Sequence, residues 1–464
     1  MTKKIRRPPE TTTKLFGTDG IRGRANEHPM TPEVAVQLGR AVAHVFKRTA
    51  SGGARPRIVI GKDTRLSNYM FETALQAGIC SMGVDAVQLG VLPTPGIAFM
   101  TTGMRADAGV VISASHNPYD DNGIKFFAAD GFKLPDEVEA QIEALVASDE
   151  LAAHCAHGDQ IGRAYRIQDA VGRYSVSLKS SFPRLLDLQG LRVVVDCANG
   201  AAYKVAPEVL YELGAEVIPL ATTPDGTNIN DHCGALYPEN MAHKVRELRA
   251  DVGIALDGDA DRVILCDAQG RIIDGDELLL VLGRRLKARG ALAKDTVVAT
   301  IMSNLGLERA FKREGIRMER VAVGDRYVVE AMRKHGYSLG GEQSGHIVMT
   351  DFATTGDGLL AALQVLAIVA ETGKPLAEIA PGFEVVPQLL ESVRVARKPP
   401  LEALPGVSAA IQAAERALGD NGRVVVRYSG TENKCRVMLE GDDEDTVREL
   451  TQAIVDALRR ELAA

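Results

Sequence analysis

The stretch RIVIGKDTRLSNYMFETALQAGICSMGVDAVQL, residues 57–89, decides the class of fold. It begins with a β-branched run at 57–60, which predicts a buried strand, and continues into a polar loop at 61–65. An amphipathic helix is predicted near 68–82, and Gly83 then falls where the end of a helix favours glycine. The last residues predict a second strand. A strand, a helix and a strand at this spacing indicate a βαβ unit and an α/β fold.

The same order of elements occurs twice more along the chain. Residues 192–220 and 296–323 each contain a β-branched run, a polar loop, a helical pattern, a glycine and a second strand pattern. Three copies predict three related α/β domains with mixed sheets. The last 80 or so residues differ, because they predict a small α+β domain with strands near 390–395, 423–427 and 436–440 and helices at 407–418 and 444–462. We therefore expect four domains, at 1–165, 166–268, 269–385 and 386–464.

The bulk composition is that of a globular protein. Of the 464 residues, 45% are apolar and 25% are charged, and the net charge of −7 argues against a nucleic-acid-binding protein. The nearly apolar stretch at 359–370 is too short to span a bilayer and predicts a buried helix. The six cysteines form no CxxC pair, which favours reduced thiols and a cytoplasmic protein.

Three aspartates, Asp257, Asp259 and Asp261, follow the apolar strand predicted at 252–256. Carboxylates at alternate positions of an extended segment project to the same side, so their oxygens can meet at one hard cation. The alternative is a solvated acidic loop. The wholly apolar strand before the cluster favours a metal site, and the ligand type suits Mg²⁺.

A second polar turn follows the apolar run at 109–112 and reads SASHNP, residues 113–118. In open α/β sheets, ligands bind at the carboxyl ends of the strands, which is where this turn lies. Ser115 therefore offers a hydroxyl that could carry a phosphoryl group, and the aspartates offer the metal site that such chemistry uses. Lys125, ten residues later, is either a solvated strand residue or a cation directed at the site, and the sequence leaves both open.

Two further loops and one arginine complete the candidate site. The glycine-rich segment 340–346 offers hydrogen-bonding groups suited to sugar hydroxyls, although an ordinary turn is the alternative. The segment 427–431, together with Arg436, combines a small-residue turn, hydroxyls and guanidinium groups, which suits a phosphate. A plain hairpin turn is its alternative. Arg22 lies among glycines at 16–23, an arrangement typical of backbone close to a ligand.

Taken together, five segments resemble those of the α-D-phosphohexomutase superfamily, in order and over nearly the whole chain. They are FGTDGIRG (16–23), SASHNP (113–118), DGDADR (257–262), GEQSGH (341–346) and RYSGTE (427–432). The resemblance implies four domains around a central cleft, three of them related α/β domains and the last a small α+β domain. This agrees with the repeat seen in the sequence.

The resemblance also implies residue roles. Ser115 would be the phosphoserine, and Mg²⁺ would be held by a phosphate oxygen on Ser115 together with Asp257, Asp259 and Asp261. Lys125 and His346 would transfer protons, and Arg22 and Arg262 would support the active site. The substrate would contact Glu342, Ser344, Arg427, Ser429, Gly430 and Thr431.

The implied activity moves a phosphoryl group between the C6 and C1 hydroxyls of a hexose through a bisphosphorylated intermediate. The segments are most similar to those of bacterial members that convert glucosamine 6-phosphate into glucosamine 1-phosphate and so supply UDP-N-acetylglucosamine and the cell wall. The alternatives are a glucose or mannose phosphate mutase, a non-catalytic sugar-phosphate sensor and a phosphatase. We expect a sugar-phosphate substrate, no nucleic acid and no membrane as partners, with a homodimer as a further option.

Overall fold

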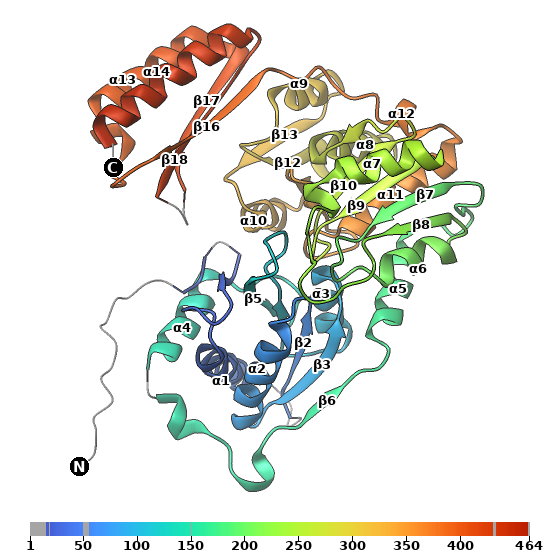
Figure 1. The fold of residues 1–464 in the computed structure, drawn as a ribbon, viewed down its shortest axis with the longest axis vertical. Helices are drawn as coiled ribbons and strands as arrows, with labels where there is room; N and C mark the ends of the chain where they lie inside the picture. The colour runs from blue at the N-terminus through green and yellow to red at the C-terminus, as the bar shows by residue number, and fades with distance from the viewer. Residues whose placement is uncertain (1–14, 18, 50–54, 149, 430–432, 463–464) are drawn as a thin grey trace.

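The computed structural model describes residues 15–17, 19–49, 55–148, 150–429 and 433–462, which form four sheets in chain order (Figure 1). The first sheet is mixed and has the strand order β1 (Ile21–Arg24), β5 (Asp121–Ala128), β4 (Ala108–Ile112), β2 (Arg57–Lys62), β3 (Asp85–Val91) and β6 (Ala164–Arg166). Its helices are α1 (Pro32–Thr49), α2 (Asn68–Ser81), α3 (Thr94–Gly103) and α4 (Asp136–Ala147).

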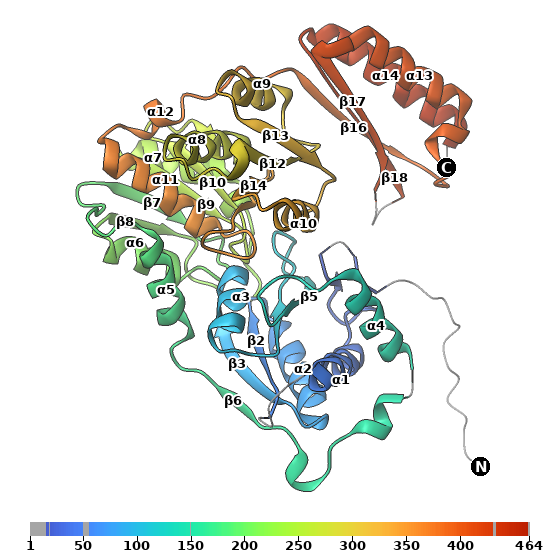
Figure 2. The same cartoon turned by 180° about the vertical axis from the view of Figure 1, so that it is seen from behind.

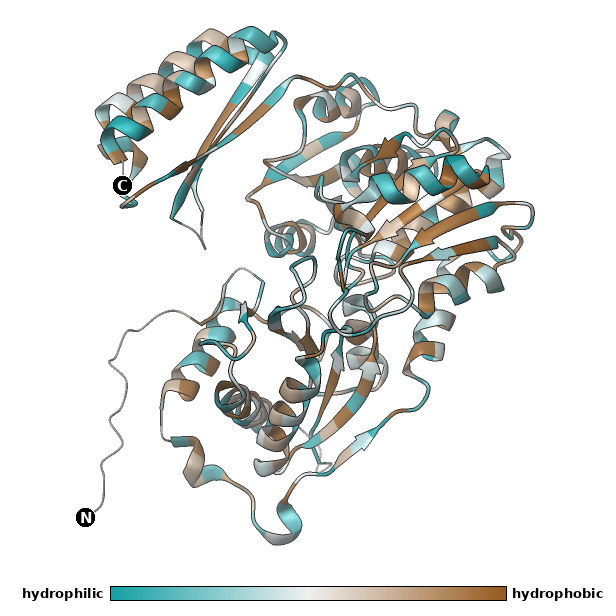
Figure 3. Ribbon diagram, in the orientation of Figure 1, coloured by the Kyte–Doolittle hydropathy of each residue, from teal (hydrophilic) through white to brown (hydrophobic). Residues whose placement is uncertain are grey.

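Strand β2 shows how the sequence builds this sheet. Successive side chains of a strand point to opposite faces. Ile58 and Ile60 accordingly pack in one hydrophobic cluster with residues of α1 and α2, whereas Val59 packs in another with Ile97 of α3. Both faces are covered, so the successive residues 58–60 of the strand are all apolar, and Figure 3 shows apolar residues along such covered strands.

The second and third sheets repeat the core of the first. The second has the order β11 (Ile272–Ile273), β10 (Val263–Asp267), β9 (Val252–Leu256), β7 (Arg192–Asp196) and β8 (Glu216–Leu220). The third has the order β13 (Arg317–Val321), β12 (Thr296–Thr300), β14 (Leu339–Gly341) and β15 (Ile347–Met349). Their helices are α6 (Val205–Glu212), α7 (Pro238–Leu248), α8 (Gly275–Ala288), α9 (Leu305–Arg313), α10 (Asp325–His335), α11 (Gly358–Thr372) and α12 (Leu376–Ile379), and α5 (Ala170–Ser181) connects the first sheet to the second.

In each repeat one strand has parallel neighbours on both sides, and a fourth strand joins antiparallel. The pattern is β5-β4-β2-β3 in the first sheet, β10-β9-β7-β8 in the second and β15-β14-β12-β13 in the third. The antiparallel strand follows its neighbour through a connection at the carboxyl end of that neighbour. This equivalent connection holds the SASHNP, DGDADR and EQSGH segments in the three repeats, so the repeated topology places all three candidate loops at corresponding positions.

Helix α11 packs against elements of more than one repeat. It contains the apolar stretch 359–370, and the prediction of a buried helix there is confirmed. Although it follows the third sheet in sequence, it contacts β9 and β10 of the second sheet, and also α5 and α8. One hydrophobic cluster consequently includes residues of all three repeats, from Val59 to Ala380.

The fourth sheet is antiparallel and has the order β16 (Gln388–Arg394), β18 (Lys434–Gly441) and β17 (Gly422–Tyr428). Helices α13 (Pro405–Leu418) and α14 (Glu444–Leu462) pack on it and form a separate hydrophobic cluster. Arg423 reaches the third sheet's loop, donating to the carbonyl of Ser303 at 3.0 Å, and Arg309 pairs with Asp442 at 2.6 Å. Figures 1 and 2 both show this unit beside the third sheet and apart from the first.

The predicted fold class, three related α/β units with mixed sheets and a C-terminal α+β unit, is confirmed. All six cysteines are free thiols, and four of them are buried. Among the described helices, none is both long enough and apolar enough to cross a bilayer.

Candidate active site

Ser115 lies in the buried turn that follows β4. Its backbone is left-handed, with φ of 52°, a conformation that costs energy for a residue with a side chain and that persists only where neighbours enforce it. Arg65 is such a neighbour, because its buried guanidinium donates to the carbonyls of Ser115 at 2.9 Å and Asn117 at 2.8 Å. The Ser113 hydroxyl also accepts a bond from the Ser115 amide at 2.9 Å. The turn therefore holds the Ser115 hydroxyl in a defined position.

The three aspartates converge as predicted, but the backbone conformation that brings them together differs from the predicted one. One carboxylate oxygen from each of Asp257, Asp259 and Asp261 lies within 4.8 Å of the others, and all three residues are buried. The predicted extended segment is wrong, because residues 258–261 form a turn in which Ala260 has a φ of 58°. The carboxylates meet because the chain turns around them.

The serine turn and the acidic turn touch each other. The Ser115 hydroxyl donates to Oδ2 of Asp257 at 2.7 Å, and Asn230 donates to the Ser115 carbonyl at 2.9 Å. Gly258 makes this approach possible, since a Cβ at that position would lie 2.5 Å from the Ser115 carbonyl oxygen. The first two repeats thus bring the hydroxyl and the acidic cluster into direct contact.

The charges of the acidic cluster suit a divalent cation. Burial, followed by repulsion from the neighbouring aspartates, raises the pKa of Asp257 and of Asp261. For Asp259, burial is opposed by Lys125 and by a hydrogen bond from Thr94 at 2.7 Å, and its pKa is lowered. The Oδ1 atoms of Asp259 and Asp261 are buried and have no hydrogen-bond partner in the described part of the chain. Because buried polar atoms are otherwise satisfied, these two oxygens fit a metal ligand role.

Lys125 is directed at the site, which settles the question that the sequence left open. It is buried in β5, and its Nζ lies 3.1 Å from Oδ2 of Asp259 and 3.1 Å from Oδ2 of Asp19. Burial alone would lower the pKa of Lys125, but these carboxylates together with Asp261 raise it above its ordinary value. The ammonium group therefore stays charged at neutral pH.

The third loop adjoins the second. Glu342 accepts from the Gly324 amide at 3.1 Å and from the Ser344 hydroxyl at 3.3 Å. His346 pairs with Arg262 in an antiparallel bridge, and the Arg262 amide donates to Asp257 at 3.2 Å. The imidazole of His346 is buried, and neither of its nitrogens has a hydrogen-bond partner among the described residues.

Arg22 and Arg262 add positive charge around Ser115. Both have a buried Nε without a hydrogen-bond partner in the described part of the chain, so both have a donor to offer an anion. Their effect is visible on His116, whose Nδ1 lies 3.3 Å from the Ser115 Oγ. Burial, followed by repulsion from Arg262 and Arg22, lowers the pKa of His116 to about 3. The two guanidinium groups thus oppose protonation of His116 and favour an anionic group on this side of Ser115.

The candidate phosphate-binding residues lie on the fourth sheet. Arg427 is directly opposite Arg436 in the β17–β18 pair, and burial followed by this neighbour lowers the pKa of Arg427. Ser429 is buried at the end of β17. Gly430 and Thr431 lie outside the described residues. Arg427 lies on β17, and Ser429 follows that strand, in the unit that lies beside the third sheet and apart from the first (Figures 1 and 2).

Several residues that hold the site were not identified from the sequence. They are Asp19, Arg65, Thr94, Lys133, Asn230 and Asp325. Asp19 and Arg65 lie within segments that the sequence analysis described, the FGTDGIRG segment and the first polar loop. The others lie in stretches without a motif, and only the tertiary structure brings them to the site.

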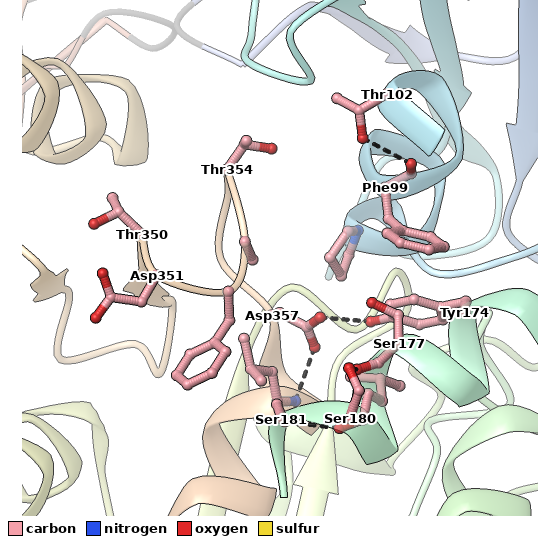
Figure 4. A pocket seen from close by; sticks show the side chains of 15 residues that line it. Phe99, Thr102, Tyr174, Ser177, Ser180, Ser181, Thr350, Asp351, Thr354 and Asp357 are labelled. Atoms are coloured by element: carbon pink, nitrogen blue, oxygen red, sulfur yellow. Dashed lines mark hydrogen bonds between the residues drawn. The ribbon is translucent and has the colours of Figure 1, made fainter. Parts of the chain in front are cut away.

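A cavity of about 310 Å³ lies between α3, α5 and the segment 350–357 (Figure 4). On its wall Asp357 accepts the Tyr174 hydroxyl at 2.6 Å and caps α11 through the Leu360 amide at 2.9 Å. Burial raises the pKa of Asp357 to about 6. None of the predicted site residues is among the described residues that line this cavity, so it is distinct from the cluster around Ser115.

Comparison with known proteins agrees with this arrangement. Models of the phosphoglucomutase/phosphomannomutase α/β/α domains I, II and III match residues 13–153, 173–270 and 274–384, and the model of the C-terminal domain matches 390–457. The chain belongs to this family, the α-D-phosphohexomutases, and is an enzyme of the isomerase class.

Within this family the chain is similar to phosphoglucosamine mutases. It is 61% identical over 455 residues to that of Anaeromyxobacter dehalogenans, covering 96% of this chain and 99% of the relative. It is 58% identical over 449 residues to that of Syntrophotalea carbinolica, covering 97% and 98%.

Solved structures show the same fold. A phosphoglucomutase/phosphomannomutase family protein from Burkholderia thailandensis superposes with a TM-score of 0.80 at 24% identity, covering 96% of this chain and 97% of that one. The N-acetylphosphoglucosamine mutase of Aspergillus fumigatus, solved in complex with GlcNAc-6P and magnesium, superposes with a TM-score of 0.66 at 18% identity, covering 96% and 95%.

Proposed function

We propose that this enzyme interconverts glucosamine 6-phosphate and glucosamine 1-phosphate and that Ser115 carries the phosphoryl group between substrate positions. The observation that carries the proposal is the contact between the Ser115 hydroxyl and Asp257, a member of the acidic cluster. The choice of sugar rests on the relatives named phosphoglucosamine mutase, which match nearly the whole chain.

Asp257, Asp259 and Asp261 would hold Mg²⁺ together with a phosphate oxygen on Ser115. The two buried carboxylate oxygens without hydrogen-bond partners support this assignment, as does the magnesium in the Aspergillus fumigatus relative's structure. When bound, the ion supplies positive charge that offsets the charge of the phosphoryl oxygens.

The cations around Ser115 would stabilise the transferring group. Arg22 and Arg262 each have a buried donor available, and Lys125 keeps its charge because three carboxylates surround it. Fixed charges in a buried site stabilise a transition state without reorganisation. These three side chains are therefore assigned to the phosphoryl oxygens.

The attacking sugar hydroxyl must lose a proton. Lys125 carries its proton at neutral pH and cannot accept another, so it is assigned to donate to the Ser115 oxygen as the phosphoryl group leaves, and His346 is assigned to accept the proton of the sugar hydroxyl. Both protons return in the second transfer. Neither ring nitrogen of His346 has a hydrogen-bond partner among the described residues, which supports this assignment. Glu342 and Ser344, in the same loop, would bind sugar hydroxyls.

Arg427, Ser429, Gly430 and Thr431 would bind the phosphate that does not react. The paired guanidinium groups of Arg427 and Arg436 support a dianionic ligand at this place. After the first transfer the bisphosphorylated sugar must turn around, so that its other phosphate faces Ser115. A domain that binds the distal phosphate would keep the intermediate in the enzyme during this turn.

The test compares turnover of glucosamine, glucose and mannose 1-phosphates by the same preparation. We expect the highest kcat/KM with the glucosamine compound. Faster turnover of mannose or glucose phosphate would contradict the choice of sugar. Release of inorganic phosphate would indicate a phosphatase, and absence of any turnover a sensor.

The product would supply UDP-N-acetylglucosamine and cell-wall precursors. The six free cysteines support placing the enzyme in the reducing cytoplasm. The substrate is the partner that the site supports, and a homodimer stays a prediction.

A further inference from the structure

Lys133 joins the first repeat to the third at the edge of the site. It lies in the connection between β5 and α4, and its side chain is only 14% exposed. Its ammonium group forms ion pairs with Asp19, before β1, and with Asp325, the first residue of α10. Figures 1 and 2 both show α10 against the connection that follows β5.

Each carboxylate that Lys133 binds has a second partner in the site. Oδ2 of Asp19 lies 3.1 Å from the Nζ of Lys125, and Lys125 in turn contacts Asp259. Oδ2 of Asp325 lies 3.6 Å from Nε2 of His346. A continuous chain of contacts between acidic and basic side chains therefore runs as Asp259, Lys125, Asp19, Lys133, Asp325 and His346.

Because Lys133 lies in the middle of this chain, it stabilises the charges of both Asp19 and Asp325. Burial opposes ionisation of Asp19 and Asp325, but Lys133 helps to lower the pKa of both, and each carboxylate repels the other's charge. Breaking a buried ion pair by removing one partner leaves an uncompensated buried charge. Without Lys133, Asp19 and Asp325 would repel each other across the contact between the two repeats.

The same connection makes other contacts with the third repeat. Arg333 pairs with Asp130 at 3.2 Å and stacks on Phe132 at 3.8 Å, and Thr354 donates to the Gly131 carbonyl at 2.6 Å. These contacts hold the connection on the third repeat. Lys133 differs from them because its partners contact the two side chains assigned to proton transfer.

We propose that Lys133 is a positioning residue that sets the places of Lys125 and His346 relative to each other when the first and third repeats pack together. This inference rests on the roles that the proposed function gives those two residues. A displacement of about 1 Å at a reacting group can lower a rate about 100-fold. Loss of the Lys133 ammonium group should therefore lower kcat.

The test is a double-mutant cycle with Lys133→Met and His346→Gln. We expect Lys133→Met to lower kcat about 30- to 100-fold with little change in KM, and Lys133→Arg to restore most of it. In the His346→Gln background, Lys133→Met should lower kcat less than 5-fold, because the histidine that it positions is already absent. A merely structural role would lower kcat by the same factor in both backgrounds and would overturn the proposal.

The matched control is Arg333→Gln, which removes an ion pair between the same two repeats. It should leave kcat within about 2-fold of the wild type, and an equal loss in both variants would overturn the specific role of Lys133. Because Lys133→Met leaves two buried carboxylates without a cation, the cycle is repeated with Lys133→Met combined with Asp325→Asn. This variant removes the repulsion and should fold, yet kcat should stay low.

All variants are assayed on whichever of the three sugar phosphates the wild type turns over fastest. A different preferred sugar then contradicts the proposed function and leaves the test of Lys133 intact. Wild-type kcat in Lys133→Met overturns the inference and leaves the proposed function standing.

Discussion

The hydroxyl of Ser115 donates a 2.7 Å hydrogen bond to Oδ2 of Asp257, although 142 positions of sequence separate the two residues. Each residue follows a buried strand in its own repeat, β4 or β9. The contact exists because the two repeats pack with equivalent loops facing each other. It joins a candidate phosphoryl carrier to a candidate metal site, and it leads to the following predictions.

Replacing Ser115 by alanine should abolish phosphoryl transfer. The variant loses the only atom proposed to carry the phosphoryl group, so we expect turnover to fall about 1,000-fold or more. Intact-mass analysis should find a phosphorylated species in the wild type and none in Ser115→Ala. Ser180→Ala, on the exposed side of α5, is the control and should retain both turnover and phosphorylation. Full activity of Ser115→Ala would rule out the phosphoserine mechanism.

Mg²⁺ binding should release protons and weaken as the pH falls. The pKa values of Asp257 and Asp261 are raised, so these carboxyl groups keep protons to a higher pH than usual and must lose them to bind a cation. Calorimetry in two buffers of different ionisation enthalpy measures the released protons. Chelation should remove activity and Mg²⁺ should restore it. The exposed control Asp351→Asn should bind Mg²⁺ as the wild type does. Wild-type Mg²⁺ binding in Asp259→Asn would contradict the assigned site.

Gly258→Ala should lower activity without unfolding the protein. The new Cβ would lie 2.5 Å from the Ser115 carbonyl oxygen, so the acidic turn must move away from the serine turn. A shift of about 1 Å predicts a loss of about 100-fold in kcat. Gly103→Ala is the matched control, since its Cβ would meet only Phe99 at an ordinary 4.0 Å. If both variants keep wild-type kcat, the close approach of the two turns has no role in catalysis.

Asp357→Asn should change how stability depends on pH. Burial raises the pKa of Asp357 to about 6, so the folded protein holds a proton there that the unfolded chain releases near pH 4. The stability that this proton contributes is complete below pH 4 and disappears as the pH rises through 6. From pH 5 to pH 8 the wild type should lose about 1 kcal/mol of unfolding free energy that Asp357→Asn does not lose. Urea unfolding of both proteins at the two pH values measures the difference, and parallel pH profiles would contradict the prediction.

Hydrophobic periodicity predicted the elements well because both faces of the strands are covered. The helix expected near 68–82 is α2 at Asn68–Ser81, and the one expected at 444–462 is α14 with the same bounds. The three candidate loops were also recognisable, since each places polar residues directly after an apolar strand.

The sequence could not show how the site is held. Arg65 and Asn230 bind the Ser115 carbonyl although they lie 50 and 115 positions away in the sequence. Only the packing of the tertiary structure brings these residues together. The turn at Ala260 was missed because alanine rarely adopts a positive φ, and local preference argued for an extended segment. Lys125 could not be assigned because its burial depends on Asp19 and Asp259, which belong to different repeats.

The equivalent placement of the three loops has a consequence for synthesis of the chain. The serine turn, the acidic turn and the loop with His346 come from three successive repeats, so they leave the ribosome one after another. A nascent or truncated chain that ends before residue 346 has the hydroxyl and the carboxylates but not the histidine loop. Assembly of the complete candidate site therefore requires all three repeats to have been made and packed together.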